Sequence, residues 1–360
     1  MSQKQVYQWM AQIAHYMPDL GYWQRQGLAL FSLGVIWAER SSLTKIAEKL
    51  AMFGKPDSLE RRLQRWISNR RIEIAGCQRA WVRWVIGAFD HRRIVLLVDE
   101  TKLGQHLSVM VVGVAYQRRC IPLVWQSYHR DCRHNGQVKL IKALLQLIDQ
   151  AVDFEYPPLV QADRGIGTSP ALCRVVHHLG WRYRFRVQNH TKVLTGKQRY
   201  VALERVVHKP GQQWSGYGVV FKQRGHIRAY VHVLWTKGQA EPWCLVTNDP
   251  LVVGNWYAVR VWQEEGFRDL KGGGWQWQHS RVWHPDHADR LILILALAYA
   301  WTLTHGTLVM ASPELLRQVT RGARKRFSVF RCGLRFLTQL LARQEPVWPG
   351  LFFAPAKRLW

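Results

Sequence analysis

The stretch RRIVLLVDE (92–100) is a run of β-branched and aliphatic residues that ends in two acids. Two similar runs follow it, LSVMVVGVAY (107–116) and CIPLVWQSY (120–128), with a turn of two arginines between them. Runs of this composition and length are typical of β-strands, and strands joined by such short connections pair antiparallel. The sequence therefore predicts a three-stranded antiparallel meander, with Asp99 at the end of its first strand.

The segments after the meander predict alternating helices and strands. VKLIKALLQLIDQAV (138–152) has the apolar spacing of an amphipathic helix, and PLVQADRG (158–165) indicates a short buried strand that ends at Asp163. A helix through Leu179 and a strand at 181–188 follow. The order β-β-β-α-β-α-β is that of the ribonuclease H-like fold, in which three antiparallel strands precede a crossover to parallel ones.

The first 90 residues have helical patterns throughout. Within them, 43–67 contains two such patterns around a Gly-Lys-Pro-Asp turn, and Ser58 is the expected N-cap of the second helix. This arrangement is compatible with a helix-turn-helix whose second helix meets DNA. The alternative is a plain helical hairpin with a basic, solvent-facing side.

The segment 190–250 interrupts the α/β pattern with Gly-rich turns and three strand-like runs, at 217–224, 226–237 and 242–249. Helical patterns resume at about residue 254 and include a long helix from about Pro285 to Met310 and two more in the tail. We therefore expect an α/β protein of four parts: a helical N-terminal DNA-binding domain (1–90), a ribonuclease H-like catalytic core (91–189 and 251–310), a β-rich insertion within that core (190–250) and a helical C-terminal region (311–360).

The charge balance indicates a polyanionic partner. The chain has 360 residues with 51 Lys and Arg against 24 Asp and Glu, a formal net charge of +27 and a pI near 10.4. Such an excess favours binding to nucleic acid first and to an anionic membrane surface second. Its 19 Trp are also numerous, and Trp serves both hydrophobic cores and base stacking.

Several features favour a cytoplasmic protein. The N-terminus lacks the apolar segment of a signal peptide. The longest apolar run, 291–303, is too short to span a membrane and indicates a buried helix, so no membrane partner is expected. The six Cys include no Cys-x-x-Cys pair, which suggests free thiols in a reducing compartment rather than a zinc site or disulfides.

The stretch YAVRVWQEEGFRDLK (257–271) mixes polar groups into a helical pattern. At ~100° per residue, Tyr257, Arg260, Glu264 and Lys271 fall within a sector of roughly 60° and form one polar stripe. Apolar residues gather on another side, which suits packing onto a sheet. Taken alone, the stripe is compatible with an ordinary solvated face or with a binding surface.

Three acids occupy positions that the predicted topology brings together. Asp99 and Asp163 end neighbouring strands, and Glu264 lies on the helix that packs beside them, although its neighbour Glu265 is an alternative. Converging carboxylates repel one another unless a cation lies between them, and hard oxygen ligands select Mg²⁺, with Mn²⁺ as a substitute. Two such ions activate a nucleophile and stabilise a leaving oxygen in phosphoryl transfer.

The spacing Y-x₂-R-x₃-E-x₆-K at these positions resembles the signature of the insertion sequence 4 family of bacterial transposases, which belongs to the DDE group. The motifs LVDET around Asp99, QADRGIG around Asp163 and FRDLKGGGWQWQHSRV (267–282) extend the resemblance, which covers about 92 to 340. The resemblance implies that Asp99, Asp163 and Glu264 are the catalytic metal ligands for two Mg²⁺ ions. It favours Glu264 over Glu265, which lies ~100° away from the stripe.

The resemblance also implies contacts to DNA. Tyr257, Arg260 and Lys271 would grip phosphates beside the cleaved bond, and Arg164 would be a further backbone contact. In this family, a Trp on the β-rich insertion stacks on a flipped base. PWCLVTNDP (242–250) is similar to that segment, which makes Trp243 the candidate and Trp235 its nearest rival. The basic runs at 61–71 and 321–327 are candidates for phosphate contacts or for solvated faces.

The activity implied is cut-and-paste transposition by strand cleavage, hairpin formation and strand transfer. The implied partner is double-stranded DNA, as terminal inverted repeats and as target, bound by a homodimer in the synaptic complex on a bacterial chromosome or plasmid. Two alternatives stay open: another nuclease with the same fold, and a catalytically inactive DNA-binding protein derived from a transposase.

Overall fold

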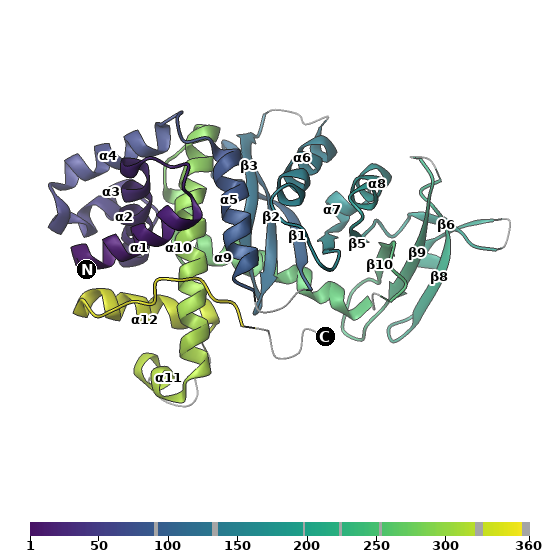
Figure 1. Ribbon diagram of the computed structural model, residues 1–360. Coiled ribbons are helices and arrows are strands. Elements are labelled where there is room, and N and C mark those ends of the chain that lie inside the picture. The colour runs from purple at the N-terminus through teal and green to yellow at the C-terminus, as the bar shows by residue number, and fades with distance from the viewer. Residues whose placement is uncertain are drawn as a thin grey trace.

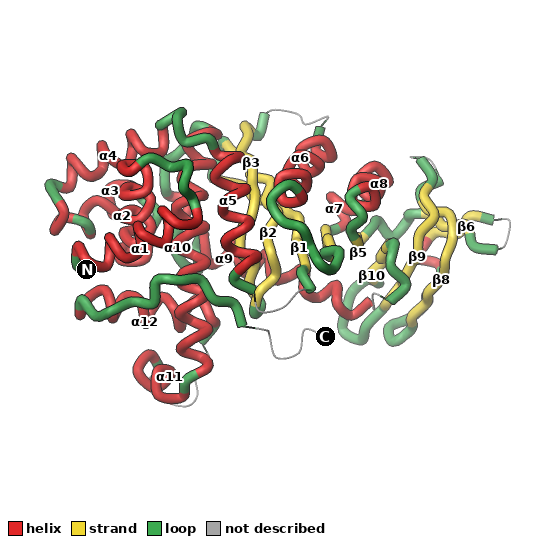
Figure 2. The backbone as a smooth tube through the Cα atoms, viewed as in Figure 1, coloured by secondary structure: helices red, strands yellow, loops and turns green. Residues whose placement is uncertain are grey.

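Helices occupy one end of the molecule, and a long sheet extends from its middle to the other end (Figure 1). Coloured by secondary structure in Figure 2, the strands begin beside α5 and continue to the far edge at β8 and β6. The structure is a computed structural model that describes residues 1–89, 93–131, 136–196, 199–222, 225–251, 254–320 and 327–354. The chain is an α/β protein with an all-helical N-terminal region and a mixed sheet, as the sequence predicts.

The N-terminal region consists of the helices α1 (Gln3–Tyr16), α2 (Tyr22–Ala38), α3 (Leu43–Lys49), α4 (Pro56–Ser68) and α5 (Ile74–Gly87), with a 3₁₀ turn η1 at Ala51–Phe53. The prediction of Ser58 as N-cap is wrong. Helix α4 begins at Pro56, and Lys55 is its N-cap, because proline lacks an N–H and suits the first helical position. Helix α4 buries Leu63 and Trp66 and packs against α2, α3 and α10.

The antiparallel meander is confirmed in β1 (Val95–Leu103), β2 (Leu107–Tyr116) and β3 (Arg119–His129). Asp99 does not end its strand. Strand β1 continues to Leu103 because Thr101 and Leu103 still pair with β2, opposite Val109 and Leu107. Asp99 therefore lies in the middle of β1, opposite Val111.

The predicted crossover to parallel strands is also present. Strands β4 (Leu159–Ala162) and β5 (Arg182–Arg186) lie parallel to β1 and to each other. Helix α6 (Gln137–Asp149) packs against β2 and β3, and α8 (Pro170–His178) packs against β5. A short helix that the sequence did not predict, α7 (Arg164–Gly167), follows Asp163 directly.

The strands beyond β5 extend this sheet rather than forming a separate one. They are β6 (Lys192–Leu194), β7 (Tyr200–Ala202), β8 (Gln213–Val220), β9 (Ile227–Leu234) and β10 (Trp243–Thr247), with a 3₁₀ turn η2 at Leu203–Arg205. Strand β10 pairs antiparallel with β5, so the order in the described part of the chain is β3-β2-β1-β4-β5-β10-β9-β8-β6-β7. The three strand-like runs correspond to β8, β9 and β10, and β6 and β7 are additional.

The helical stretch that begins the last third of the chain differs from the expected one. Residues Gly254–Arg260 form a 3₁₀ helix, η3, and the α-helix α9 covers only Val261–Leu270. Because a 3₁₀ turn has about 3.0 residues rather than ~3.6, the single stripe predicted over 257–271 does not hold. Tyr257 is buried, which also excludes a fully solvated face.

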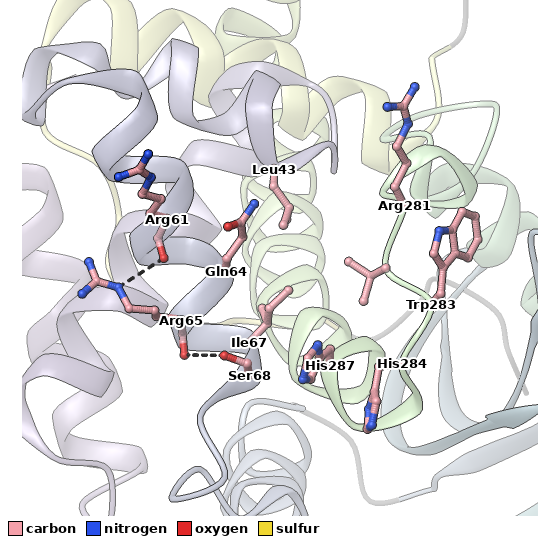
Figure 3. A pocket seen from close by; sticks show the side chains of 11 residues that line it. Leu43, Arg61, Gln64, Arg65, Ile67, Ser68, Arg281, Trp283, His284 and His287 are labelled. Atoms are coloured by element: carbon pink, nitrogen blue, oxygen red, sulfur yellow. Dashed lines mark hydrogen bonds between the residues drawn. The ribbon is translucent and has the colours of Figure 1, made fainter.

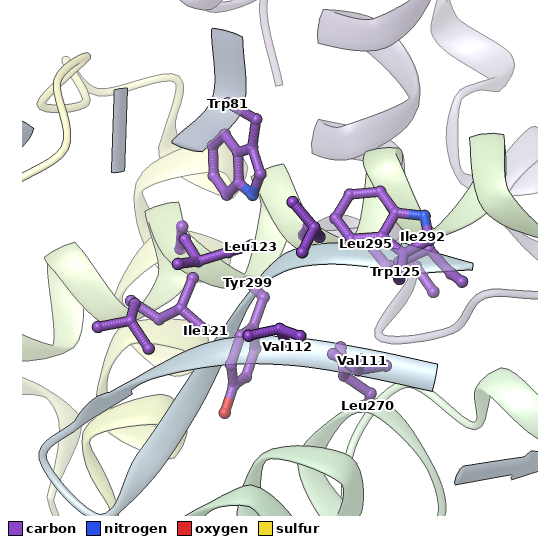
Figure 4. Packing of buried hydrophobic residues seen from close by; sticks show 14 of the residues in the cluster. Trp81, Val111, Val112, Ile121, Leu123, Trp125, Leu270, Ile292, Leu295 and Tyr299 are labelled. Atoms are coloured by element: carbon purple, nitrogen blue, oxygen red, sulfur yellow. The ribbon is translucent and has the colours of Figure 1, made fainter. Parts of the chain in front are cut away.

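Helix α10 (Pro285–Ala311) is the central helix of the molecule and packs against α2, α4, α12 and β3. Its bounds match the long helix predicted from Pro285 to Met310, and the two expected tail helices are α11 (Pro313–Val319) and α12 (Val329–Arg343). A 3₁₀ turn, η4, lies at Trp277–His279. Figure 4 shows how Tyr299 and Leu295 of α10 meet Trp81 of α5 and Trp125 of β3 in the main hydrophobic core.

The long apolar helix and five of the six cysteines lie in the interior of the protein. Among the described residues, α10 alone is long and apolar enough to span a membrane, and most of its apolar stretch is buried inside the protein. Cys77, Cys120, Cys173, Cys244 and Cys332 are free and buried, which agrees with the expectation of free thiols, while Cys132 lies outside the described residues.

Helices α10 and α12 touch backbone to backbone at two glycines. A Cβ on Gly333 would lie 1.8 Å from the Thr302 carbonyl oxygen, and one on Gly306 would lie 1.9 Å from that of Val329. We expect Gly333→Ala to lower the free energy of unfolding by about 3 kcal/mol, because the two helices would have to separate. Chemical denaturation measures this change.

Gly87→Ala is the matched control for that substitution. Gly87 is the last residue of α5, and a Cβ there would meet no atom within 4 Å. The free energy of unfolding of Gly87→Ala should therefore be unchanged or slightly higher than that of the wild type, since alanine favours helix more than glycine does. Equal stabilities for the two variants would refute the close packing of α10 on α12.

Candidate active site

Asp99 lies on the face of the sheet that η3 and α9 cover. Side chains alternate along a strand, so Asp99 shares a face with Val95, Leu97 and Thr101. Val95 and Leu97 pack with Val259 of η3 in a small apolar cluster on this face. Asp99 is thus a partly buried carboxylate at the edge of an apolar patch.

Asp163 lies beside Asp99 because β4 runs parallel to β1. Val98 is opposite Ala162 in this pair, so the residue after each, Asp99 and Asp163, stands at the same level. Asp163 is also the N-cap of α7, and its Oδ1 accepts a hydrogen bond of 3.0 Å from the backbone N–H of Ile166. That bond engages Oδ1, whereas Oδ2 lies on the side of Arg260, 3.8 Å from its Nη2.

Glu264 reaches the same place from α9, which two contacts fix against the meander. The side chain of Gln263 donates a hydrogen bond to the Val111 carbonyl oxygen. A Cβ on Gly266 would come within 2.9 Å of the Cys120 carbonyl oxygen, so only glycine permits this approach. Glu264 then stands on the exposed side of the helix, above β1.

The Arg260 guanidinium joins the three acids. Its Nη2 lies 3.0 Å from Asp99 Oδ2 and 3.8 Å from Asp163 Oδ2, and its Nη1 donates to Glu264 Oε1. The Arg260 side chain is only 13% exposed, so these are not ordinary surface ion pairs. The structure thus brings together all three acids that the sequence singled out.

The electrostatics of the cluster favour a cation. Burial raises the pKa of Asp99 to about 6, with Asp163 and Glu264 adding to the increase, while Arg260 opposes it. Burial alone would lower the pKa of Arg260, but Asp99 and its other anionic neighbours raise it overall. A cation beside Asp99 therefore favours its ionised form.

The alternative acid, Glu265, points elsewhere. It pairs with Arg268 at 2.7 Å and lies 3.6 Å from Arg119. Glu265 is therefore engaged in a separate ion-pair network on the β3 side of α9.

The remaining residues of the signature take different positions around the acids. Lys271 Nζ donates to Thr101 Oγ1 and to the Lys102 carbonyl oxygen, at 2.6 Å each, and burial lowers its pKa. Tyr257 is buried, with its pKa raised by burial. Its ring lies 5.1 Å from that of Trp243, edge to face.

Trp243 and Arg164, the two weaker candidates, also lie near the acids. Trp243 begins β10 and is half-buried against Tyr257, whereas its rival Trp235 lies beyond β9 and donates to the Gln239 carbonyl oxygen. Arg164 follows Asp163 directly and pairs with Glu241 at 2.8 Å. In this conformation Arg164 is thus an ion-paired residue.

Sequence reasoning missed Thr101 and Glu241. Thr101 could have been found from the period of two, because it stands two residues after Asp99 on the same face. Glu241 lies in the turn before β10 and contacts Arg164, Arg186 and Asn189. These partners are distant in sequence, so no local pattern predicts the contacts. Of the two basic runs, 61–71 lies on and after α4, and residues 321–326 fall outside the described residues.

The donor set suits a divalent metal by its chemistry. Asp99, Asp163 and Glu264 offer the oxygen ligands that Mg²⁺ and Mn²⁺ prefer. As the side chains lie, no three acidic, His or Cys groups in the described ranges are close enough to hold one ion, and Arg260 stands between the acids. The Arg260 guanidinium thus lies where the three negative charges converge.

A scan against protein-family models finds no family that matches this chain, and a search of curated proteins finds no match.

Proposed function

We propose that the chain is a DDE-type DNA transposase with a ribonuclease H-like catalytic core, which moves an insertion sequence by cut-and-paste transposition. One observation carries the proposal: Asp99, Asp163 and Glu264, from three separate elements, surround a single cation. The strand order β3-β2-β1-β4-β5, antiparallel and then parallel, supports the assignment of the core. The resemblance at Tyr257, Arg260, Glu264 and Lys271 supports the reaction class.

Asp99, Asp163 and Glu264 would hold two Mg²⁺ ions, with Mn²⁺ as a substitute. When bound, these ions activate the attacking oxygen and stabilise the leaving oxygen at phosphorus. Arg260 and Lys271 would orient the phosphates beside the scissile bond, because both cations already line the acid cluster. Tyr257 would hold Trp243 in place to stack on an extruded base, and Arg164 would contact the backbone after leaving Glu241.

The partners proposed are the element's terminal inverted repeats and a double-stranded target, bound by a homodimer that brings the two ends together. The net charge of +27 supports attraction to DNA of any sequence. In the cell, we place the protein in the cytoplasm on bacterial chromosomal or plasmid DNA.

The test is cleavage of DNA that carries the inverted repeats flanking the gene. The protein is mixed with this DNA and Mg²⁺ at moderate salt, and the products are resolved on a denaturing gel. We expect nicks and then hairpins at the repeat boundary, followed by strand-transfer products when target DNA is added.

Two outcomes would favour the alternatives. Cleavage without hairpins or strand transfer would indicate another nuclease with this fold. Binding of the repeats without cleavage, in both Mg²⁺ and Mn²⁺, would indicate a DNA-binding protein that has lost catalysis.

A further inference from the structure

A cavity lies between α4 and the segment 281–287, which leads into α10 (Figure 3). Its volume is about 870 Å³, within the range of roughly 300–1,000 Å³ that is usual for ligand pockets. No acid is among its described lining residues. The charged or titratable side chains that line it are Arg61 and Arg65 from α4 and Arg281, His284 and His287 from the opposite side.

The arginines at this cavity are available for a ligand. Figure 3 shows Arg61 and Arg65 on one side of the cavity and Arg281 on the other, with the Arg61 and Arg65 guanidinium groups directed away from Trp283 and Arg65 Nε donating to the Arg61 carbonyl oxygen at 3.3 Å. In the part of the chain that is described, no carboxylate forms an ion pair with any of the three. A concave surface with such cations attracts phosphate groups.

Trp283 adds an exposed aromatic ring to the same cavity. It is 41% exposed, although Trp is among the largest apolar side chains. The turn between β1 and β2 holds the ring: the His106 ring lies 4.9 Å away, and a Cβ on Gly104 would come within 2.7 Å of Trp283. A ring that is fixed on one side and open on the other is a surface for stacking a base.

His284 supplies a hydrogen-bond donor to the same cavity. Its Nδ1 accepts from the backbone N–H of Asp286 at 3.2 Å, as the N-cap of α10. In the neutral ring the proton is therefore on Nε2, which can donate to a phosphate or a base. The His287 ring stacks on it, with 4.6 Å between centroids.

The cavity lies along β1 from the acid cluster. Strand β1 rises about 3.3 Å per residue, so Gly104 is roughly 17 Å from Asp99. Lys271 Nζ donates to the Lys102 carbonyl oxygen, so a positive charge lies beside β1 between Asp99 and Gly104. At about 3.4 Å per nucleotide, some five nucleotides cover this distance.

We propose that this cavity binds a segment of unpaired DNA strand that leads away from the acid cluster, with a base stacked on Trp283 and phosphates held by Arg61, Arg65 and Arg281. The inference rests on the proposed function, since a transposase generates free strands at the cleaved bond. A volume of about 870 Å³ is large enough for nucleotides of one strand.

The experiment measures binding of a labelled oligodeoxythymidine of about 12 nucleotides and of a duplex of equal length. We expect Trp283→Ala to weaken oligodeoxythymidine binding at least about fivefold, the usual effect of losing one stacked base. Arg61→Gln/Arg65→Gln should reduce the salt slope of log K by about 1.4, because each phosphate contact on a single strand contributes about 0.7. Duplex affinity should change less than about twofold.

Matched controls distinguish the effect of the cavity residues on binding from the effect of the protein's overall positive charge. Lys139→Gln/Lys142→Gln removes two exposed cations one turn apart on α6, and Trp23→Ala removes a Trp that is 72% exposed on α2. Both should bind oligodeoxythymidine like the wild type. Trp283→Phe keeps an aromatic ring and should retain most of the affinity, which guards against a folding defect in Trp283→Ala.

Three results would overturn the proposal: unchanged binding in the pocket variants, equal losses in the controls, or an equal loss for duplex. Oligodeoxythymidine binding and DNA cleavage are measured separately on the wild type and the pocket variants, so the two hypotheses can fail independently. If the wild type fails to cleave DNA but the pocket variants behave as expected, the strand-binding cavity stands and the transposase proposal fails.

Discussion

Glu264→Gln should reduce the rate of DNA cleavage by about 10²–10³-fold, whereas Glu265→Gln should retain most of it. Glu264 shares the Arg260 cation with Asp99 and Asp163, so its charge belongs to the cluster that would hold the metal ions. Glutamine keeps the shape of the side chain but lacks that charge, and groups that stabilise transition-state charge contribute factors of about 10²–10³. The measurement is the single-turnover rate of nicking in Mg²⁺.

The adjacent acid is the matched control for this prediction. Glu265 occupies the same helix with the same chemistry, but it pairs with Arg268 and Arg119, away from Asp99. Because Glu264 is 57% exposed at its side chain, its replacement should leave the melting temperature nearly unchanged. Similar losses of cleavage in the two variants would contradict the assignment of Glu264.

Arg260→Gln should make the stability of the protein depend on divalent metal. The substitution removes the cation that pairs with all three acids and leaves Asp99, with its side chain 15% exposed, facing two like charges. Breaking a buried ion pair costs about 3–5 kcal/mol, and we expect the lower part of that range because Glu264 is largely exposed. The melting temperature in EDTA should therefore fall by several degrees.

Millimolar Mg²⁺ or Mn²⁺ should restore most of that loss, because a ligand that binds only the folded state stabilises it by mass action. The wild type should respond less to the same ions, since its guanidinium competes for the acids. Cleavage should also decrease, as Arg260 is proposed to hold a phosphate once DNA is bound. Thermal unfolding in EDTA and in each metal measures the effect.

Arg268→Gln is the control for the arginine substitution. Arg268 lies on α9 two turns from Arg260, is 64% exposed and pairs only with Glu265 among the described residues. Its loss should change neither the melting temperature nor its metal dependence by a measurable amount. A decrease in Arg260→Gln that no metal reverses would show that the acids hold no divalent ion.

Much of the framework follows from local pattern. Each run of the meander and the helix at 138–152 is identified by its own composition, because strands and helices repeat their apolar residues at periods of two and about 3.6. Asp163 at the end of β4 could be placed for the same reason. The end of β1 could not, since its last residues are polar and pair with β2 only because the hairpin closes there.

The helix at 257–271 shows where local pattern fails. Its spacing fits one α-helical stripe, yet the chain forms 3₁₀ turns up to Arg260 and an α-helix after it. Tyr257 and Val259 are buried there against the sheet, and this packing overrides the intrinsic preference. The residues of the signature still meet, but around the acids rather than along one solvated face.

The sequence by itself determined the class of fold and the excess of positive charge, because these depend on composition and on neighbours within a few residues. Only the tertiary structure decided that β10 joins the insertion to β5, that Arg260 stands between the acids, and that Trp283 and α4 border one cavity. These relations join residues that are far apart in the chain. They depend on contacts that form only when the sheet and α10 pack together. The local spacing of apolar residues therefore cannot predict them.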